Sequence, residues 1–392
     1  MLAWLGRHPG FVVVPIALGW SALRFGPVPV GYTLAGLVLI TVVWGRAHPA
    51  SFDRWVAPWL RSMKRRWWDY RGRRWSDVLI DCDLSRDNRR TGELIVPRVD
   101  RVRAVTPSID TLRVRMVRGQ DMRTWTDQAE ALAHALGVER VAIAKHRPGR
   151  LHIVVEREMP FTTALPAPEI PASVQDVNLR ALDIGDDEYG QPMTVPVIGG
   201  SHLLVAAASG AGKSGAMWGM HRAMGPMIRE GLVRVRMIDL KGGTETELGR
   251  DLFYRRAITM DDAIELLREA VADMQDTQRR MNEARLRKVD VSPEFPLDFI
   301  PIDELAMLTA YGDRAQVREA IRLLALLMTQ GRSSLFSVAG FVQEPSKDIV
   351  EVRDLFTARV CLGVTAASHV DMVLGEGALD RGALAHEIPL DE

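Results

Sequence analysis

The sequence predicts an α/β protein with a parallel sheet, preceded by a small α+β domain and an N-terminal transmembrane helical hairpin. Three observations lead to this prediction. A phosphate-binding loop follows an apolar run at residues 203–206, strand and helix patterns alternate from residue 176 onward, and two apolar stretches lie near the N-terminus. Such alternation favours a parallel sheet with helices on both faces. With 392 residues, the chain is long enough for two or three compact domains.

Charge and cysteine content restrict the possible partners very little. Basic and acidic side chains balance, with 50 of each, so the net charge favours no class of partner. The two cysteines, Cys82 and Cys361, have no metal-like spacing and form no disulfide framework. Most of the chain therefore suits a reducing cytosol.

Two apolar stretches near the N-terminus, residues 11–23 and 28–44, are separated by a turn-like break at residues 24–27. The second approaches the ~20 residues that a membrane-spanning helix needs, whereas the first is shorter. We therefore expect a transmembrane hairpin over residues 1–46. The alternatives are a signal peptide, for which the sequence has no small-residue cleavage site, and a hairpin buried in a soluble core.

Residues 47–90 form a basic juxtamembrane segment in which arginines and Lys64 are interleaved with five tryptophans. Basic residues collect on the cytoplasmic side of membrane segments, so we expect a protein of the cell membrane with both termini in the cytoplasm. Aromatic and basic side chains beside a membrane favour membrane lipid headgroups as a partner. Contact with nucleic acid is the alternative.

Residues 91–160 are expected to form the small α+β domain. We expect strands at residues 94–97, 111–116, 140–144 and 151–155, and a helix at residues 124–136 between the second and third strands. The helix is predicted by apolar side chains at helical spacing, and the turn signal at Pro148 and Gly149 joins the last two strands. A proline-rich stretch then marks a linker at residues 161–175.

The remaining residues, 176–392, are expected to form the parallel-sheet domain. We expect strands at residues 203–206, 233–238, 297–302, 337–342 and 359–362, and helices at residues 214–230, 260–287 and 314–330. In P-loop motors the strand order is 5-1-4-3-2, which would put the fourth strand between the first and the third. Pro301 removes a backbone donor inside the third strand, so we expect a bulge or local distortion there.

The phosphate-binding loop occupies residues 207–214. Its candidate nucleotide-binding residues are Ala208, Ser209, Gly210, Ala211, Gly212, Lys213 and Ser214. Glycines let backbone N–H groups curl around a polyphosphate, Lys213 would reach the β- and γ-phosphates of ATP, and Ser214 would hold Mg²⁺. Ala207 replaces the usual first glycine, which is tolerable where φ is negative. A chance match to the pattern is the alternative.

A second motif lies ninety residues further along, where an apolar strand ends in Asp303 and Glu304. This is the pattern of a Walker B strand, in which Asp303 would orient the Mg²⁺ shell and Glu304 would polarise the attacking water. Alone, it would equally describe a buried strand with an acidic turn. Together with the phosphate-binding loop, it favours a nucleotide-hydrolysing site.

These two motifs, with residues 331–332 before the fourth strand and residues 341–346 at its end, resemble the FtsK/SpoIIIE motor proteins over about residues 90–385. The resemblance implies a RecA-like P-loop NTPase motor beside a small α domain. It also implies a homo-hexameric ring that hydrolyses ATP and pumps double-stranded DNA through its centre. Residues 239–245 and the short anchor resemble the actinobacterial conjugal-transfer, TraB-like branch.

The sequence departs from the family pattern in a few places. Glu344 stands where the family often has arginine. The sequence ends at Glu392 without the closing strand and winged-helix DNA-reading domain that such translocases commonly carry, so we expect the C-terminal end to be incomplete.

Other residues are assigned by their predicted position. Gln343, at the tip of the fourth strand, would sense the γ-phosphate or serve only as a strand-end polar residue. Arg332 would be a catalytic arginine finger that reaches a neighbouring subunit, or a solvated helix-end arginine. Asp239 is expected to cap the next turn rather than assist magnesium. Lys241 would face DNA in a loop, and His202 is expected to be a structural hydrogen-bonding residue.

Three functions remain open on the sequence. The first is a membrane-anchored, ATP-driven pump for double-stranded DNA, acting in conjugation or in chromosome partition. The second is a type VII secretion-like ATPase that acts on proteins, a class that usually carries several motor domains in one chain. The third is a membrane protein in which nucleotide binding only switches conformation. Glu304 beside Asp303 favours hydrolysis over binding alone.

Overall fold

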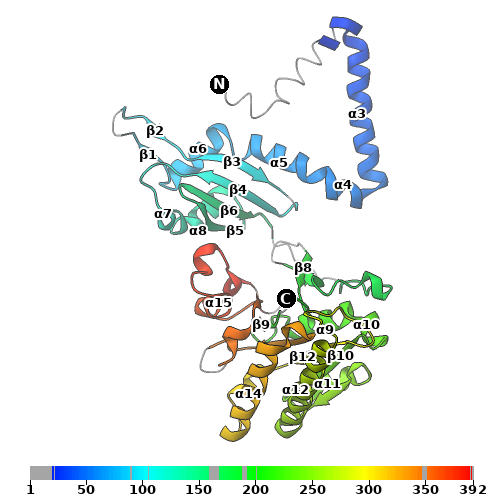
Figure 1. The fold of residues 1–392 in the computed structure, drawn as a ribbon. Helices are drawn as coiled ribbons and strands as arrows, with labels where there is room; N and C mark the ends of the chain where they lie inside the picture. Colours follow the sequence, from blue (N-terminus) through cyan, green and yellow to red (C-terminus); the bar gives the residue numbers. More distant parts are fainter. Residues whose placement is uncertain are drawn as a thin grey trace.

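The computed structural model describes residues 20–21, 23–88, 91–104, 106–158, 167–187, 192–199, 201–346, 351–388 and 390. It contains a long N-terminal helix, an α+β unit and a larger unit built on a parallel sheet (Figure 1). Arg140 in the α+β unit forms an ion pair with Glu387 in the larger unit, with 3.0 Å between Nη1 and Oε2.

The N-terminal helix α3 spans Pro27–Ala47 and begins at a Gly-Pro pair, where Gly26 has a φ of 85°. By length and composition it is the one helix in the described part of the chain that could cross a membrane. Its apolar side chains are exposed, as for Leu39 at 64%. Most of the first predicted span, residues 11–19 and 22, lies outside the described residues.

Three shorter helices connect α3 to the α+β unit. They are α4 (Pro49–Trp55), α5 (Ala57–Trp68) and α6 (Gly72–Asp81). Tyr70, Trp75 and Leu79 belong to the same hydrophobic core as Leu112 and Ile153 of the sheet. The second half of the predicted juxtamembrane segment therefore packs into the α+β unit.

The sheet of the α+β unit is antiparallel, with strand order β3-β4-β6-β5. Its strands are β3 (Arg98–Arg103), β4 (Ile109–Arg115), β5 (Arg140–Arg147) and β6 (Arg150–Glu156), and its helices are α7 (Met122–Thr126) and α8 (Ala129–Leu136). A two-stranded ribbon of β1 (Arg86–Asp87) and β2 (Leu94–Ile95) lies beside it.

Three features of this unit differ from the expectations. The strand predicted at residues 94–97 ends at Ile95, because Pro97 lacks the N–H that a ladder needs. The first strand of the main sheet is β3, which the sequence did not indicate because arginines and an aspartate occupy most of its positions. The predicted helix at residues 124–136 is divided at residues 127–128 into α7 and α8.

The larger unit contains a six-stranded, fully parallel sheet of order β11-β10-β12-β13-β9-β14. Its strands are β9 (Leu203–Ala206), β10 (Val233–Ile238), β11 (Arg255–Ala257), β12 (Leu297–Ile302), β13 (Phe336–Val342) and β14 (Ala358–Cys361). The predicted order is confirmed: β13, the fourth predicted strand, lies between β9 and β12. The edge strand β11 was not predicted, because three residues are too few for a readable pattern.

Helices cover both faces of this sheet. They are α9 (Lys213–Ala223), α10 (Gly225–Arg229), α11 (Thr244–Leu248), α12 (Met260–Glu283), α13 (Leu305–Thr309), α14 (Arg314–Gln330) and α15 (Ala367–Leu374). Leu204 packs in a core that includes α12 and α14, whereas its neighbour Val205 packs in a core that includes α9. Successive strand residues therefore face opposite layers. A short hairpin of β7 (Leu182–Asp186) and β8 (Pro192–Val195) also contributes to the core on the α9 side.

Two prolines alter the predicted strands and helices of this unit. Pro301 pairs with Ala339 of β13 in an unbroken register, so no bulge forms there. Toward β10 the register is the same on both sides of Pro301, but pairs are absent between Phe299 and Ile302. The distortion is thus confined to one side of the strand. The helix predicted at residues 214–230 is divided at Met224, because Pro226 lies in the first turn of the new helix α10 and cannot continue α9.

Candidate nucleotide-binding site

The phosphate-binding loop joins β9 to α9. Gly210 and Gly212 both have a φ of 83°, a backbone conformation that residues other than glycine rarely adopt. Helix α9 begins directly after them, at Lys213. Ala207 is fully buried and does not have a positive φ, so this position does not require glycine. The backbone N–H of Ala207 donates to the carbonyl of Val342 at 3.0 Å, which fixes the loop beside the tip of β13.

Lys213 brings the two predicted motifs together. Its Nζ donates to the backbone carbonyl of Asp303 at 2.7 Å and lies 3.0 Å from Asp303 Oδ1. It also lies 3.7 Å from Glu304 Oε2. Residues ninety positions apart in the chain therefore form one cluster, because β9 and β12 end at the same edge of the parallel sheet.

A cavity of about 460 Å³ opens over this cluster. Its lining includes Ala208, Ser209, Gly210, Gly212, Lys213, Ser214, Asp303 and Gln343. These are predicted site residues, and Asp239, Lys241, Thr244 and Glu245 from the loop after β10 complete the wall. The cavity lies at the start of α9, where unpaired N–H groups and the positive end of the helix favour an anion.

The hydroxyl of Ser214 donates to Oε1 of Glu245 at 2.7 Å, and the indole N–H of Trp218 donates to Oε2 at 2.6 Å. Glu245 was not among the predicted site residues. Its only signal in the sequence is an acidic side chain in the loop that follows the strand next to β12. Asp239 folds this loop back, because its carboxylate accepts from the N–H groups of Lys241 and Glu245, both at 3.0 Å. The predicted capping role of Asp239 is therefore confirmed.

Glu304 is almost completely buried and is held from two sides. Its Oε2 lies 2.8 Å from Nζ of Lys241, and its Oε1 accepts from the backbone N–H of Gln343 at 3.3 Å. Lys241, which was expected to face DNA, contacts the acidic pair instead. Gln343 follows β13, as predicted, and its position beside Glu304 comes from the placement of β13 between β12 and β9.

The electrostatics of the acidic pair reflect burial. Burial raises the pKa of Asp303 above the ordinary carboxyl value, and the positive charge and hydrogen bond of Lys213 oppose this increase. The Lys213 ammonium therefore helps to keep Asp303 ionised.

The oxygen donors in the cavity fit Mg²⁺. The hydroxyl of Ser214 and the carboxylates of Asp239, Glu245 and Asp303 line it, and Mg²⁺ prefers hard oxygen ligands. Within the described part of the chain, no group of three or more His, Cys, Asp or Glu residues could hold a metal ion by itself. Mg²⁺ usually binds through one or two protein carboxylates together with substrate phosphates and water, so the carboxylates that line the cavity are sufficient ligands for it.

Four predicted residues are not part of the cavity lining: Ala211 and Glu304, which adjoin residues that line it, and Arg332 and His202, which lie away from it. Arg332 precedes β13, whereas the cavity lies beyond the other end of that strand, so the structure does not bring Arg332 to the site of its own chain. His202 is buried at the start of β9. It contacts the carbonyl of Met328 through Nε2 at 3.0 Å and accepts from the N–H of Val338 through Nδ1 at 3.2 Å, which confirms its structural role.

Comparisons with known proteins agree with this geometry. The FtsK/SpoIIIE family model matches residues 174–381, which is more than half of the chain. The chain belongs to the FtsK/SpoIIIE family. The model for the actinomycete conjugal transfer protein N-terminal domain matches residues 43–157. The family's ATPase domain implies ATP hydrolysis, and the two matches together relate this ATPase to conjugal transfer proteins.

The chain is similar to the DNA translocase FtsK of Halalkalibacterium halodurans, with 23% identity over 300 residues, which cover 70% of this chain and 37% of the relative. It is also similar to Protein Tra of Streptomyces lividans, with 23% identity over 222 residues, which cover 52% and 34%. The matched region thus spans about a third of the length of these relatives.

Among solved structures, the chain is similar to the pCW3 conjugation coupling protein TcpA in its monomer form with ATPgS. The TM-score is 0.48 at 17% identity, over 73% of this chain and 83% of that chain. It is also similar to ATPases 2 and 3 of Thermomonospora curvata EccC in complex with a signal sequence peptide. There the TM-score is 0.34 at 21% identity, over 50% of this chain and 36% of that chain.

Proposed function

We propose that this protein is a membrane-anchored, ATP-driven translocase of double-stranded DNA that acts in the conjugal transfer of a plasmid or integrative element. The observation that carries the hydrolytic part is the Lys213 ammonium, 3.0 Å from Asp303 and 3.7 Å from Glu304 at the edge of a P-loop sheet. The conjugal part is supported by the match of residues 43–157 to the conjugal transfer N-terminal domain.

The residues of the site divide the work of phosphoryl transfer. Backbone N–H groups of residues 208–214 and the Lys213 ammonium bind the β- and γ-phosphates of ATP. Ser214 and Asp303 would hold Mg²⁺, whose positive charge would offset the negative charge of the phosphates. Glu304 accepts a proton from the attacking water, and Gln343 contacts the γ-phosphate. The water oxygen forms a bond to the γ-phosphorus. The bond between the γ-phosphorus and the β–γ bridging oxygen breaks, and ADP leaves with that oxygen.

This chemistry requires three rearrangements of the contacts described above. Lys213 exchanges part of its contact with Asp303 for phosphate oxygens, and the Ser214 hydroxyl leaves Glu245 to face the metal. Glu304 must also part from Lys241, because a carboxylate paired with an ammonium is a poor proton acceptor. The nucleotide therefore competes with contacts inside the chain.

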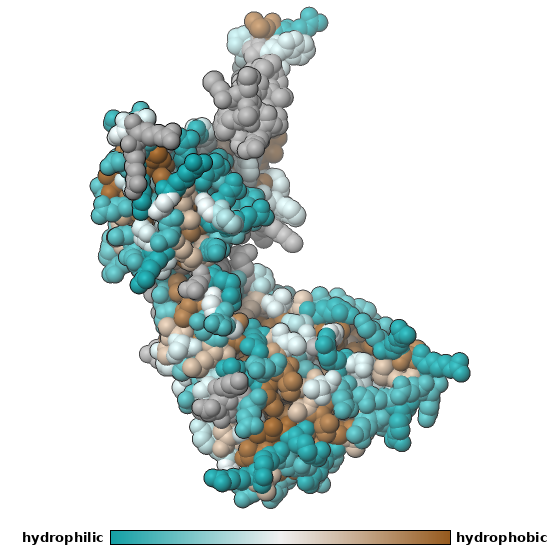
Figure 2. Space-filling model, turned by 60° about the vertical axis from the view of Figure 1, so that its left-hand side comes forward, coloured by the Kyte–Doolittle hydropathy of each residue, from teal (hydrophilic) through white to brown (hydrophobic). Residues whose placement is uncertain are grey.

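The assembly is proposed to be a homo-hexamer in which Arg332 reaches the site of a neighbouring subunit. Arg332 is exposed and lies at the end of β13 away from its own cavity, as a residue that acts on a neighbour must. Apolar residues are also exposed over the motor unit (Figure 2), and exposed apolar patches commonly mark interfaces between proteins. An arginine finger contributes roughly 10³–10⁵ in rate where it operates.

The membrane anchor is proposed to be α3, with the other predicted span preceding it and the motor in the cytoplasm. Support comes from its length of 21 residues and from apolar side chains that no part of the described chain covers. Carbonate extraction of membranes tests this: an anchored protein stays in the pellet.

Two further functions are compatible with the same motor, a chromosome-partition pump and a type VII secretion-like ATPase that acts on protein. The matched conjugal transfer domain favours DNA transfer over both. A site that only switches conformation is disfavoured by the buried Glu304 beside Asp303, since binding alone does not need a second acid.

Two substitutions test the hydrolytic site. Lys213→Ala should abolish ATP turnover, and Glu304→Gln should retain bound ATP with little hydrolysis. ATPase activity near wild type in either variant would contradict the assigned roles. Substituting the exposed Lys288 in the same way provides a control that should not change the rate.

Translocation is tested by displacement of a third strand from duplex DNA, with the full chain in detergent. ATP-dependent displacement, lost in Lys213→Ala, is expected of a DNA pump. A secretion ATPase would hydrolyse ATP but leave the triplex intact, and a conformational switch would do neither. The ATPase and displacement assays thus separate failure of the site from failure of the proposed substrate.

A further inference from the structure

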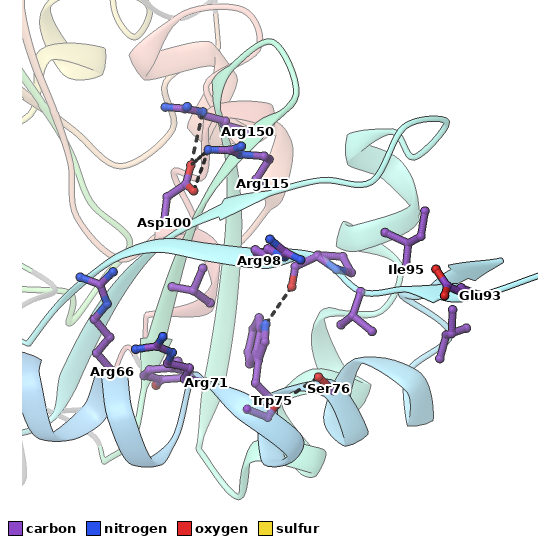
Figure 3. A pocket seen from close by; sticks show the side chains of 16 residues that line it. Arg66, Arg71, Trp75, Ser76, Glu93, Ile95, Arg98, Asp100, Arg115 and Arg150 are labelled. Carbon is purple, nitrogen blue, oxygen red and sulfur yellow. Dashed lines mark hydrogen bonds and ion pairs between the residues drawn. The ribbon is translucent and has the colours of Figure 1, made fainter. Parts of the chain in front are cut away.

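A cavity of about 1210 Å³ lies in the α+β unit, far from the nucleotide site. It is bounded by α5, α6, β2 and β3, with the ends of β4 and β6 facing it (Figure 3). We name it the arginine pocket and define it by Arg66, Arg71, Arg98, Trp75, Leu94 and Ile95. Nothing in the nucleotide chemistry uses these residues.

The charge of the pocket is positive and partly uncompensated. Five arginines line it against two acids, Glu93 and Asp100. Asp100 is already paired, with Arg115 at 3.0 Å and Arg150 at 3.5 Å. Among the residues that the structure describes, no carboxylate forms an ion pair with the other three arginines, Arg66, Arg71 and Arg98. Three guanidinium groups therefore remain available to an anion.

These arginines are held by a built framework rather than by mobile loops. Arg65 and Tyr70, which flank Arg66 and Arg71, both contact the buried Asp110, at 3.3 and 2.7 Å. The Arg71 guanidinium also lies over the Trp67 ring, 4.2 Å from its centroid.

The indole of Trp75 donates to the carbonyl of Pro97 at 3.1 Å and so ties α6 to the strand that carries Arg98 (Figure 3). Both walls of the pocket are therefore attached to one core, and binding an anion costs little further ordering.

The rim of the pocket is apolar and exposed. Leu94 and Ile95 of β2 have 47% and 41% of their surface exposed, although both line the pocket. Trp59 and Trp68, on α5 but outside the pocket lining, are also exposed, at 63% and 71%. A basic cavity edged by exposed aliphatic side chains suits a ligand with a phosphate and a hydrocarbon part. The outer surface of duplex DNA consists of sugar and phosphate and has no hydrocarbon chain to place against Leu94 and Ile95.

The position of the pocket points to the membrane surface. In Figure 1, α5 and α6 lie on the side of the α+β unit that faces away from the motor, and α3 extends on that same side. Along the chain, α4 and the first part of α5 lie between the end of α3 and Arg66, the first residue of the pocket.

We propose that the arginine pocket binds the phosphate of an anionic phospholipid headgroup, with Arg66, Arg71 and Arg98 as the phosphate ligands and Leu94 and Ile95 against the glycerol and acyl region. The inference rests on the proposed membrane attachment but is tested separately from it. A lipid held there would fix the α+β unit, and with it the motor, at a set distance from the bilayer.

The test uses the full chain in dodecyl maltoside micelles and counts bound lipid by native mass spectrometry. Dioctanoyl phosphatidylglycerol should bind at least tenfold more tightly than dioctanoyl phosphatidylcholine. The variant Arg66→Gln/Arg71→Gln/Arg98→Gln should lose this preference, and its affinity for phosphatidylglycerol should fall by on the order of a hundredfold if the three contributions add. The variant Arg73→Gln/Arg101→Gln/Arg103→Gln removes the same charge from exposed positions outside the pocket and should retain it.

A second variant, Leu94→Asn/Ile95→Asn, keeps all the arginines and should weaken phosphatidylglycerol binding while the ATPase rate stays at the wild-type value. It keeps the test decisive if the triple arginine variant fails to fold.

Equal binding of the two lipids by wild type, or equal loss in the charge-matched control, would overturn the proposal. Competition by inorganic phosphate at the lipid's own concentration would assign the pocket to a soluble anion. Loss of duplex DNA binding alone in the triple arginine variant would assign it to DNA. The micelle assay does not need α3 to span a bilayer, so failed carbonate extraction and failed lipid selection are distinguishable.

Discussion

Nζ of Lys241 lies 2.8 Å from Oε2 of Glu304, although the two residues follow different strands of the sheet, β10 and β12. Glu304 has 5% of its side chain exposed, whereas Lys241 has 36% exposed. The acid proposed to activate water is thus restrained by a lysine that a partner outside the site can reach. Anything that draws Lys241 away leaves Glu304 free to accept a proton.

Replacing Lys241 with methionine should therefore increase ATP hydrolysis in the absence of DNA. An ion pair of about 1 kcal/mol corresponds to roughly a fivefold change in rate. Stimulation of the ATPase by long duplex DNA should shrink by a similar factor, because the restraint is already gone. Lys288→Met, at an exposed position outside the cavity, serves as the control. An unchanged or lower basal ATPase rate in Lys241→Met would show that Lys241 does not restrain Glu304.

Trp218 should report the arrival of nucleotide. Its indole N–H and the Ser214 hydroxyl share the carboxylate of Glu245, at 2.6 and 2.7 Å. If Ser214 turns to the metal, Glu245 loses one of its two donors and the environment of the indole changes. We expect a change in tryptophan fluorescence on addition of Mg²⁺ and a non-hydrolysable ATP analogue. Trp218→Phe and Lys213→Ala should both lose the signal; its persistence in Trp218→Phe would assign it to another tryptophan.

Local patterns were sufficient to predict much of the site. The phosphate-binding loop and the acidic pair are contiguous motifs, and the strand order of P-loop motors brings them together with Gln343. The contacts of Glu245 and Lys241 were not predictable, because they depend on how Asp239 folds the loop after β10. No periodicity or motif encodes that path.

The elements that sequence reasoning missed are short or polar. β11 has three residues, and β3 has only two apolar residues, Val99 and Val102, which are three positions apart and so do not follow the alternation of a strand. The break between α9 and α10 at Met224 could have been predicted from Pro226, since proline disfavours a continuous helix. Helices α5 and α6 were predicted as a separate basic segment, because the contacts that join Tyr70 and Trp75 to the sheet are tertiary.

The buried ion pairs at the start of β12 should be important for stability. Asp298 is fully buried, and its Oδ1 accepts from Nε of Arg236 at 2.7 Å, while Arg234 contacts the other oxygen. Asp298→Asn would leave the buried Arg236 with too little negative charge and should lower the free energy of unfolding by about 3–5 kcal/mol. Chemical denaturation measures this change.

Two comparisons make that measurement specific. Asp276→Asn breaks an exposed pair with Arg279 and should cost less than about 1 kcal/mol. The double variant Arg236→Met/Asp298→Leu removes the buried charges together and should be more stable than Asp298→Asn alone. A single variant as stable as wild type would show that the buried pair contributes little.

Stability should fall in mild acid because of two buried imidazoles. Burial lowers the pKa of His202 and of His221 from 6.5 to about 4 in each case. Both remain neutral in the folded protein while the unfolded chain takes up protons below pH 6.5, so their contribution is complete above that pH and is lost as pH falls toward 4. The loss approaches roughly 3 kcal/mol for each imidazole at the acid end. Asp110 acts in the opposite direction, because burial raises its pKa to about 6 and the folded state then takes up its proton first.

The measurement therefore compares denaturation of wild type with His202→Gln and His221→Gln across this range. Each variant should show a flatter pH dependence than wild type, and an identical slope would mean that the imidazole is already charged in the folded protein.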